Sequence, residues 1–155
     1  MSEIRFLGNI EAKTDVKGRV FLPAVFRKVL QGSGDEVLVL RKDVHQPCLV
    51  LYPLSVWNKR IDTLMQRVNE FDRASKMVLR QYASEAMELT LDGNGRFLIP
   101  KEYLAKAQIN QSVRFLGIND TIEIWSAENT EQPFLSDEDF ASQLEALMVT
   151  TPKTV

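Results

Sequence analysis

The sequence contains an internal duplication, and this feature constrains the fold more than any other. Residues 15–23 read DVKGRVFLP and residues 92–100 read DGNGRFLIP, so one segment returns after 77 residues. The similarity extends to two further apolar segments: residues 37–40 align with 113–116, and residues 49–52 align with 122–125. Two copies at so long a period do not form a solenoid. The chain is therefore expected to pack two similar units together.

Each copy is expected to contain a strand, a turn, a strand, a short helix and a further pair of strands. Gly18 supplies the positive φ that a tight hairpin turn often requires, and β-prone residues 19–22 follow it. Pro23 suits the first position of a helix, which predicts helices over residues 24–30 and, in the second copy, over 101–107. About eight strands and two short helices result.

The remaining segments are expected to be helical. Between residues 54 and 82, apolar residues recur every three or four positions, which predicts one long amphipathic helix or two consecutive ones. Ser136 and the three acidic residues after it resemble an N-cap with first-turn carboxylates, which predicts a helix over residues 140–148. The expected organisation is a first unit over residues 1–76, a second over 77–127, and an acidic tail with a short helix over 128–155.

Charge is divided unevenly along the chain, although the formal net charge is only -2. Residues 1–114 carry 18 Lys and Arg against 13 Asp and Glu, whereas residues 115–155 carry one Lys and eight acidic residues. Nucleic acid, if bound, is expected to meet the first part. No apolar run approaches the roughly 20 residues of a membrane-spanning helix, and no secretory signal pattern opens the chain, which predicts a cytoplasmic protein without a membrane partner.

The motif Asp-x-x-Gly-Arg supplies the candidate site. Asp15 and Asp92 are expected to accept hydrogen bonds from the turn backbone and, with the turn glycines Gly18 and Gly95, to orient the hairpins. A guanidinium just past a hairpin turn either locks the aspartate or reaches phosphates and guanine edges, and the residues alone leave both roles open. The DNA-binding candidates are therefore the basic residues on or near the two hairpins: Arg19, Arg96, Lys17, Lys13 and Arg5.

No pattern indicates catalysis or a cofactor. A phosphate-binding glycine loop, a nucleophile elbow and a zinc-binding HExxH helix are all missing from the sequence. His45 is the one histidine, and no set of about four suitably spaced metal ligands accompanies it. Cys48, the one cysteine, lies in an apolar run and is expected to be a buried, inert thiol. We expect neither an enzyme nor a metal site.

The two motif segments resemble those of a known family. Residues 6–8 (FLG) and 15–27 (DVKGRVFLPAVFR) resemble the first half of MraZ proteins, and residues 91–100 (LDGNGRFLIP) resemble their second half. The similarity covers nearly the whole chain, and two Asp-x-x-Gly-Arg motifs at this separation are a specific signal. One copy alone would indicate only the wider AbrB-like group, which includes antitoxins and transition-state regulators.

This resemblance implies an α+β fold, namely a tandem, pseudo-twofold, swapped-hairpin β-barrel with amphipathic helices. It also implies a homo-oligomer, expected to be a ring. The function implied is that of a nucleoid-associated transcriptional regulator, expected to be a repressor, which binds double-stranded DNA at direct repeats near the promoter of the division and cell-wall gene cluster.

Carried over by position, Arg19 and Arg96 are the DNA-contacting residues of this resemblance, and Asp15 and Asp92 orient the turns. Asn94 departs from the pattern where the first copy has a lysine, so the first hairpin is expected to dominate. Two other classes of function remain open. One is a structural or partner-binding oligomer in which the arginines only lock the hairpins. The other is an antitoxin whose acidic tail covers a basic toxin.

Overall fold

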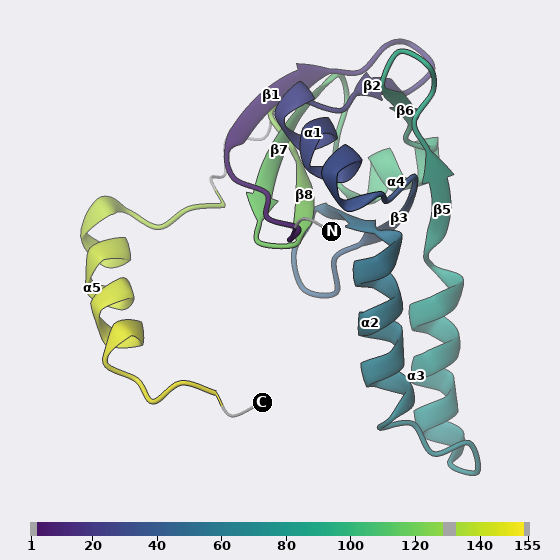
Figure 1. Ribbon diagram of the computed structural model, residues 1–155, viewed down its shortest axis with the longest axis vertical. Coiled ribbons are helices and arrows are strands. Elements are labelled where there is room, and N and C mark those ends of the chain that lie inside the picture. Colours follow the sequence, from purple (N-terminus) through teal and green to yellow (C-terminus); the bar gives the residue numbers. More distant parts are fainter. Residues whose placement is uncertain (1–2, 129–132, 154–155) are drawn as a thin grey trace.

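The computed structural model describes residues 3–128 and 133–153, and these residues form eight strands and five helices (Figure 1). The strands are β1 (Asn9–Lys13), β2 (Arg19–Phe21), β3 (Val37–Lys42), β4 (Leu49–Pro53), β5 (Met87–Thr90), β6 (Arg96–Leu98), β7 (Ser112–Ile118) and β8 (Thr121–Ser126). The helices are α1 (Ala24–Ser33), α2 (Leu54–Met65), α3 (Arg73–Ser84), α4 (Lys101–Lys106) and α5 (Asp137–Met148). None of the helices described is long and apolar enough to cross a membrane.

The strands of the two copies are interleaved. Six of them form an antiparallel sheet in the order β1-β7-β8-β4-β3-β5, and the other two form a separate antiparallel ribbon, β2-β6. Because β1 of the first copy pairs with β7 of the second, and β5 of the second pairs with β3 of the first, each copy completes the other. The first two strands of each copy therefore pair with strands of the other copy.

The mixed α and β architecture with antiparallel strands agrees with the predicted class, but the predicted barrel closure is not observed. In the described part of the chain, β1 and β5 stand at opposite edges of the six-stranded sheet and share no ladder. The physical reason lies in the turns at Asp15 and Asp92, which lead the chain out of β1 and β5 into the separate ribbon. The sheet is thus open, and the ribbon lies apart from it.

The core is shared between the two copies. Val20 and Phe97 face each other across the ribbon and are both buried, whereas the residues on either side of them point outward. Phe6 and Phe26 meet edge to face, with ring centroids 5.6 Å apart. The largest fully buried side chains of the described residues are Phe6, Phe26, Phe115, Leu22, Leu38, Leu40, Leu49, Leu51, Ile99, Ile122, Ile124 and Val20.

The segment between the copies forms two helices, which was one of the two arrangements predicted. α2 and α3 run side by side and project away from the sheet (Figure 1). Neither Gly nor Pro separates them; Asn69 and Asp72 make the turn instead, and the Asp72 carboxylate caps α3 by accepting a hydrogen bond from the Ser75 amide at 3.1 Å. Near the sheet, Trp57 stacks on Tyr82 with ring centroids 5.2 Å apart.

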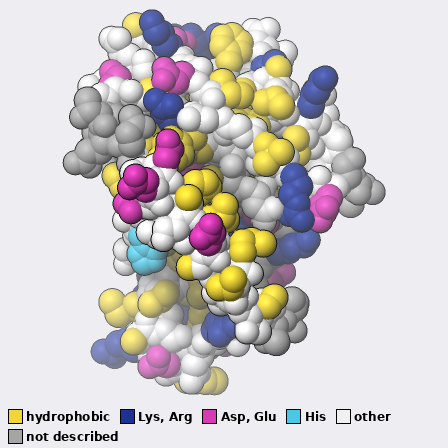
Figure 2. Space-filling model, turned by 90° about the vertical axis from the view of Figure 1, so that its left-hand side faces the viewer, with side chains coloured by type: hydrophobic (Ala, Val, Ile, Leu, Met, Phe, Trp, Pro, Cys, Tyr) yellow, Lys and Arg dark blue, Asp and Glu magenta, His cyan; other side chains and the backbone are white. Residues whose placement is uncertain are grey.

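The helix boundaries follow the predicted caps. Pro23 and Pro100 each precede a short helix, and α1 continues one turn beyond the prediction because Gly32 stays helical and Gly34, at φ 80°, ends it. Ser136 caps α5 as predicted, accepting a hydrogen bond from the Asp139 amide. Figure 1 shows α5 standing apart from the rest of the fold, and Figure 2, seen from that side, shows hydrophobic and acidic side chains together.

Candidate nucleic-acid interface

The first hairpin turn is organised by Asp15. One carboxylate oxygen accepts hydrogen bonds from the amides of Lys17 and Arg19, both at 2.9 Å, and the other accepts one from Arg19 Nε at 2.7 Å. The backbone closes the turn through Gly18 N–H to the Asp15 carbonyl at 3.0 Å, and Gly18 has the predicted positive φ, at 92°. Asp15 therefore fixes both the turn and the direction of the arginine.

The second turn repeats this arrangement. Asp92 accepts hydrogen bonds from the amides of Asn94 and Arg96 and from Arg96 Nε, each at 2.9 Å, and Gly95 has a φ of 82°. The backbone N–H of each arginine is the largest influence that lowers the pKa of Asp15 and of Asp92. Both carboxylates are held in the charged form that orients an arginine.

The ribbon brings the two motif arginines onto one face. Arg19 lies opposite Leu98, and Phe21 lies opposite Arg96, so the arginines are diagonal neighbours with side chains on the same outward side. Such diagonal positions are roughly 7–8 Å apart. Within the described residues, each guanidinium donates only its Nε to the turn aspartate, which leaves the terminal nitrogens available. The duplication therefore yields one site with two arginines.

Each turn rests on a helix of the other copy. Gly18 lies against the Ile99 carbonyl and Leu104, where an added Cβ would come within 2.6 Å of the carbonyl oxygen. Two equivalent backbone bonds anchor the turns, Leu22 N–H to Gly95 O at 3.0 Å and Ile99 N–H to Gly18 O at 2.9 Å. The turns and the arginines between them are thus fixed by both copies.

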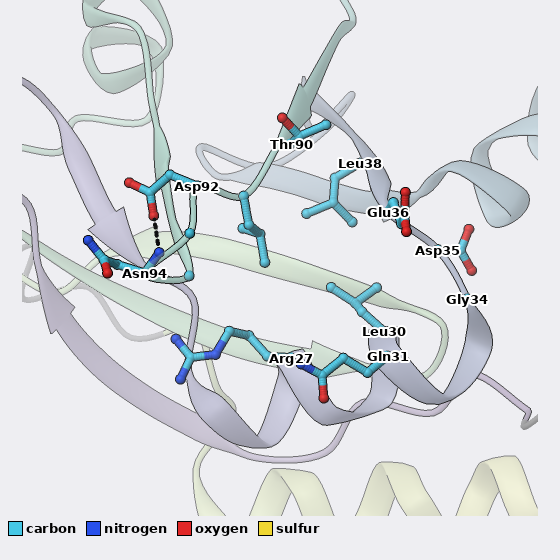
Figure 3. Close-up of a pocket in the computed structure, with 13 residues that line it drawn as sticks. Arg27, Leu30, Gln31, Gly34, Asp35, Glu36, Leu38, Thr90, Asp92 and Asn94 are labelled. Carbon is cyan, nitrogen blue, oxygen red and sulfur yellow. Dashed lines mark hydrogen bonds between the residues drawn. The ribbon is translucent and has the colours of Figure 1, made fainter.

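Arg27 is a basic residue that sequence reasoning did not assign to the site. Its guanidinium lies against Gly95, where an added Cβ would collide with it, and forms no ion pair with another described residue. Figure 3 shows Arg27 reaching from α1 beneath the Asn94 turn, at one end of a cavity of about 740 Å³. Leu104 holds the equivalent place in the other copy, so comparing the copies position by position would have singled out Arg27.

The other predicted cations are not all brought together. Lys17 is exposed in the first turn, and Lys13 is exposed at the end of β1 that leads into it. Beside them, Lys101 of α4, which was not predicted from the sequence, lines a cavity of about 320 Å³. Arg5 lies at the opposite end of β7, beside Asn119 and paired with Glu3 at 3.0 Å. About 24 Å of strand separates it from Lys13. Arg5 as a DNA contact therefore stays a prediction separate from this face.

Possible metal ligands gather at Cys48, where Asp43 and Glu123 place their ligand atoms within 4.8 Å of the sulfur and of each other. The Asp43 carboxylate accepts hydrogen bonds from the amides of His45 and Gln46, and Glu123 accepts one from the Trp125 indole. Burial raises the pKa of the Cys48 thiol, which favours its neutral form, whereas metal binding requires the thiolate. The local hydrogen bonds account for both carboxylates as structural groups.

The fold and the site together define a duplicated chain whose two copies build one arginine-bearing β-ribbon. The family model described as "MraZ protein, putative antitoxin-like" matches residues 6–81 and again 82–149. The chain is 57% identical to the transcriptional regulator MraZ of Phocaeicola vulgatus, covering 95% of this chain and 96% of the relative. It is 51% identical to that of Bacteroides thetaiotaomicron (94% and 93% covered) and 33% identical to that of Christiangramia forsetii (94% of each). The chain belongs to the MraZ family.

Proposed function

We propose that this protein is a DNA-binding transcriptional regulator that contacts duplex DNA through the outward face of the β2-β6 ribbon. The observation that carries the proposal is the position of Arg19 and Arg96 as diagonal neighbours on that face. The curated relatives are named as transcriptional regulators, which supports the same function. A two-stranded ribbon fits the major groove of B-form DNA, where arginine is the commonest specific partner of guanine.

The turn aspartates prepare the arginines for this role. Because Asp15 and Asp92 hold Nε of each guanidinium, the arginine side chains are already ordered and little side-chain freedom is lost on binding. An arginine that only locked its hairpin would be expected to be buried, yet 39% of the Arg19 side chain is exposed. The same aspartate contact therefore serves both the turn and the DNA.

Cations beside the two turns would bind phosphates on either side of the groove. Lys13, Lys17 and Lys101 lie beside the first turn, and Arg27 lies beneath the second. Phosphate contacts fix register without reading sequence, whereas base contacts specify it. The second turn has the neutral Asn94 where the first has Lys17. In this proposal Arg27 supplies the missing positive charge beside the second turn.

We further propose that the chain forms a ring-shaped homo-oligomer, associated with the nucleoid, that represses the division and cell-wall gene cluster through direct repeats near its promoter. Successive ribbons would then meet successive repeats. Linked weak contacts gain avidity when the spacing of the sites matches the spacing of the repeats. The family model matches the chain twice, at residues 6–81 and 82–149. Because the two copies share one ribbon, each subunit would contribute one ribbon to the ring.

The test is a fluorescence-anisotropy titration of the purified protein, at two salt concentrations, with promoter DNA upstream of its own gene and with a scrambled duplex. We expect tight, salt-sensitive binding to the promoter and much weaker binding to the scramble. Lys59→Ala removes an exposed cation on α2, away from the ribbon, and is the control variant. Equal or absent binding to both duplexes would overturn the proposal in favour of a partner-binding oligomer or an antitoxin.

A further inference from the structure

Helix α5 carries an apolar face that nothing in its own chain covers. Every described residue from 134 to 153 is exposed. Phe140, Leu144, Leu147 and Met148 follow the spacing i, i+4, i+7 and i+8, which places them in one stripe along the helix. Such a stripe normally packs against another element. Figure 1 shows α5 standing apart from the rest of the fold, and Figure 2, seen from that side, shows hydrophobic side chains at the surface.

The charge of α5 is of one sign. The helix contains four acidic residues and neither Lys nor Arg. Glu138 and Glu145 are seven residues apart, so they lie above one another on one edge of the apolar stripe. A partner for this helix therefore needs an apolar stripe with a basic edge beside it.

Helix α3 has that surface. Ala74, Met77 and Val78 are exposed and form an apolar stripe on its outer side, while Leu79 and Tyr82 are less exposed. Three cations spaced i, i+3 and i+7 lie along one edge of the stripe: Arg73, Lys76 and Arg80. None of the three forms an ion pair with a described residue. Both α3 and α5 have 12 residues, and Arg73 and Arg80 are seven residues apart, as Glu138 and Glu145 are, so the charged edges of the two helices match in spacing.

We propose that α5 of one copy packs on the outer face of α3 of a second copy, with Glu138 and Glu145 beside the basic edge. Figure 1 places α3 beyond α2 as seen from α5, so the outer face of α3 is turned away from the α5 of the same chain. Because the contact joins two different surfaces, it repeats head to tail and closes into a ring where the rotation allows. The inference rests on the proposed self-association and names the surfaces that produce it.

The test uses charge reversal at exposed positions and reads the size of the full-length protein by size-exclusion chromatography with light scattering and by native mass spectrometry. Glu138→Lys with Glu145→Lys reverses the charge on the edge of α5. Lys76→Glu with Arg80→Glu reverses the charge on the edge of α3. Each double variant alone is expected to weaken the subunit contact by at least about tenfold, because like charges then face each other. Mixed in equal amounts, the two variants restore the assembly, since each reversed helix meets its complement.

A matched control, Glu88→Lys with Glu102→Lys, makes the same charge change at exposed positions outside both helices and is expected to leave the size unchanged. Circular dichroism reports whether each variant is folded. A wild-type chain that stays monomeric overturns the self-association and this contact together. An oligomer whose size neither reversal changes, or a mixture that fails to reassemble, overturns the α5–α3 contact alone and leaves both the oligomer and DNA binding standing.

Discussion

The two hairpin turns have the same backbone but different surroundings. In each, an aspartate binds two amides and an arginine Nε, and a glycine takes a positive φ. The first turn carries Lys17 and rests on Leu104, whereas the second carries Asn94 and rests on Arg27. The duplicated motif thus determines how an arginine is presented, whereas the additional positive charge comes from the turn itself in the first copy and from the helix beneath the turn in the second.

The largest difference between the turns is expected in stability. Gly18→Ala forces a Cβ to within 2.6 Å of the backbone oxygen of Ile99 at a φ of 92°. A backbone atom cannot yield easily, so we expect a loss of about 3 kcal/mol in the free energy of unfolding. At Gly95 the added Cβ meets the flexible Arg27 side chain, and Gly95→Ala is expected to cost about 1–2 kcal/mol.

Urea denaturation followed by circular dichroism measures both losses, with Gly93→Ala as the control, because open space surrounds a Cβ there and its φ lies outside the positive range. Equal losses at Gly18 and Gly95 would mean that the two turns are equally confined, against the difference described here.

DNA affinity is expected to distinguish the two arginines. Arg96 is 27% exposed and its guanidinium lies 5.8 Å from the Phe21 ring, whereas Arg19 is 39% exposed and meets no ring among the described residues. Arg19→Ala should therefore cost about 2 kcal/mol in promoter binding and Arg96→Ala about 1 kcal/mol, measured by anisotropy. A larger loss of affinity for Arg96→Ala than for Arg19→Ala would show that the second turn contributes more to DNA binding.

The cations beside the turns are expected to act through phosphates. Lys17→Ala and Arg27→Leu should each lower the salt slope of binding by about one, with little change in sequence preference. Arg27→Leu copies Leu104 into the second turn, and adding Asn94→Lys should restore the lost slope there. If Arg27→Leu leaves the salt slope unchanged, Arg27 only packs against the second turn and does not contact phosphate.

The smallest expected effect concerns acid stability, and it should be the same in both turns. Folding lowers the pKa of Asp15 and Asp92, chiefly through the backbone N–H of Arg19 and Arg96. Each carboxylate therefore contributes stability above about pH 4, the value of an unfolded aspartate, and this contribution is lost as the pH falls through the lowered folded pKa. The urea midpoint of the wild-type protein should fall as the pH is lowered from 5 to 2.5. Asp15→Asn and Asp92→Asn should each make this fall smaller, and by the same amount. Unequal flattening in urea titrations would contradict the equivalence of the two turns.

Local features of the fold were predictable because they depend on residues near in sequence. Gly18 and Asp15 specified the turn, Pro23 and Pro100 marked helix starts, and Ser136 marked a cap. The break between α2 and α3 was harder to predict, since Asn69 and Asp72 make a turn without Gly or Pro. Turns and caps formed by neighbouring residues can be predicted from a single sequence. A helix break is harder to predict where polar residues, and not Gly or Pro, make the turn.

The pairing between copies could not be read from the residues themselves. Period-two alternation shows which side of β1 is apolar, but it does not tell whether β1 pairs with β7 or with a strand of its own copy. The family resemblance implied swapped hairpins, but the ribbon register that places Arg19 beside Arg96 came from the structure. Comparing the copies shows Arg27 where the second copy has Leu104, but its contact with the Gly95 turn, 68 residues away in the sequence, is visible only in the structure.

The most direct test of the ribbon as the DNA-contacting surface is photo-crosslinking to the promoter duplex. Benzoylphenylalanine replaces Leu98, which lies opposite Arg19 and is 48% exposed, or, as a control, Met65, which is 42% exposed at the end of α2. We predict efficient crosslinking from position 98, competed by unlabelled promoter, and little from position 65. Promoter binding with no crosslink from position 98, or with equal crosslinks from both positions, would contradict the account.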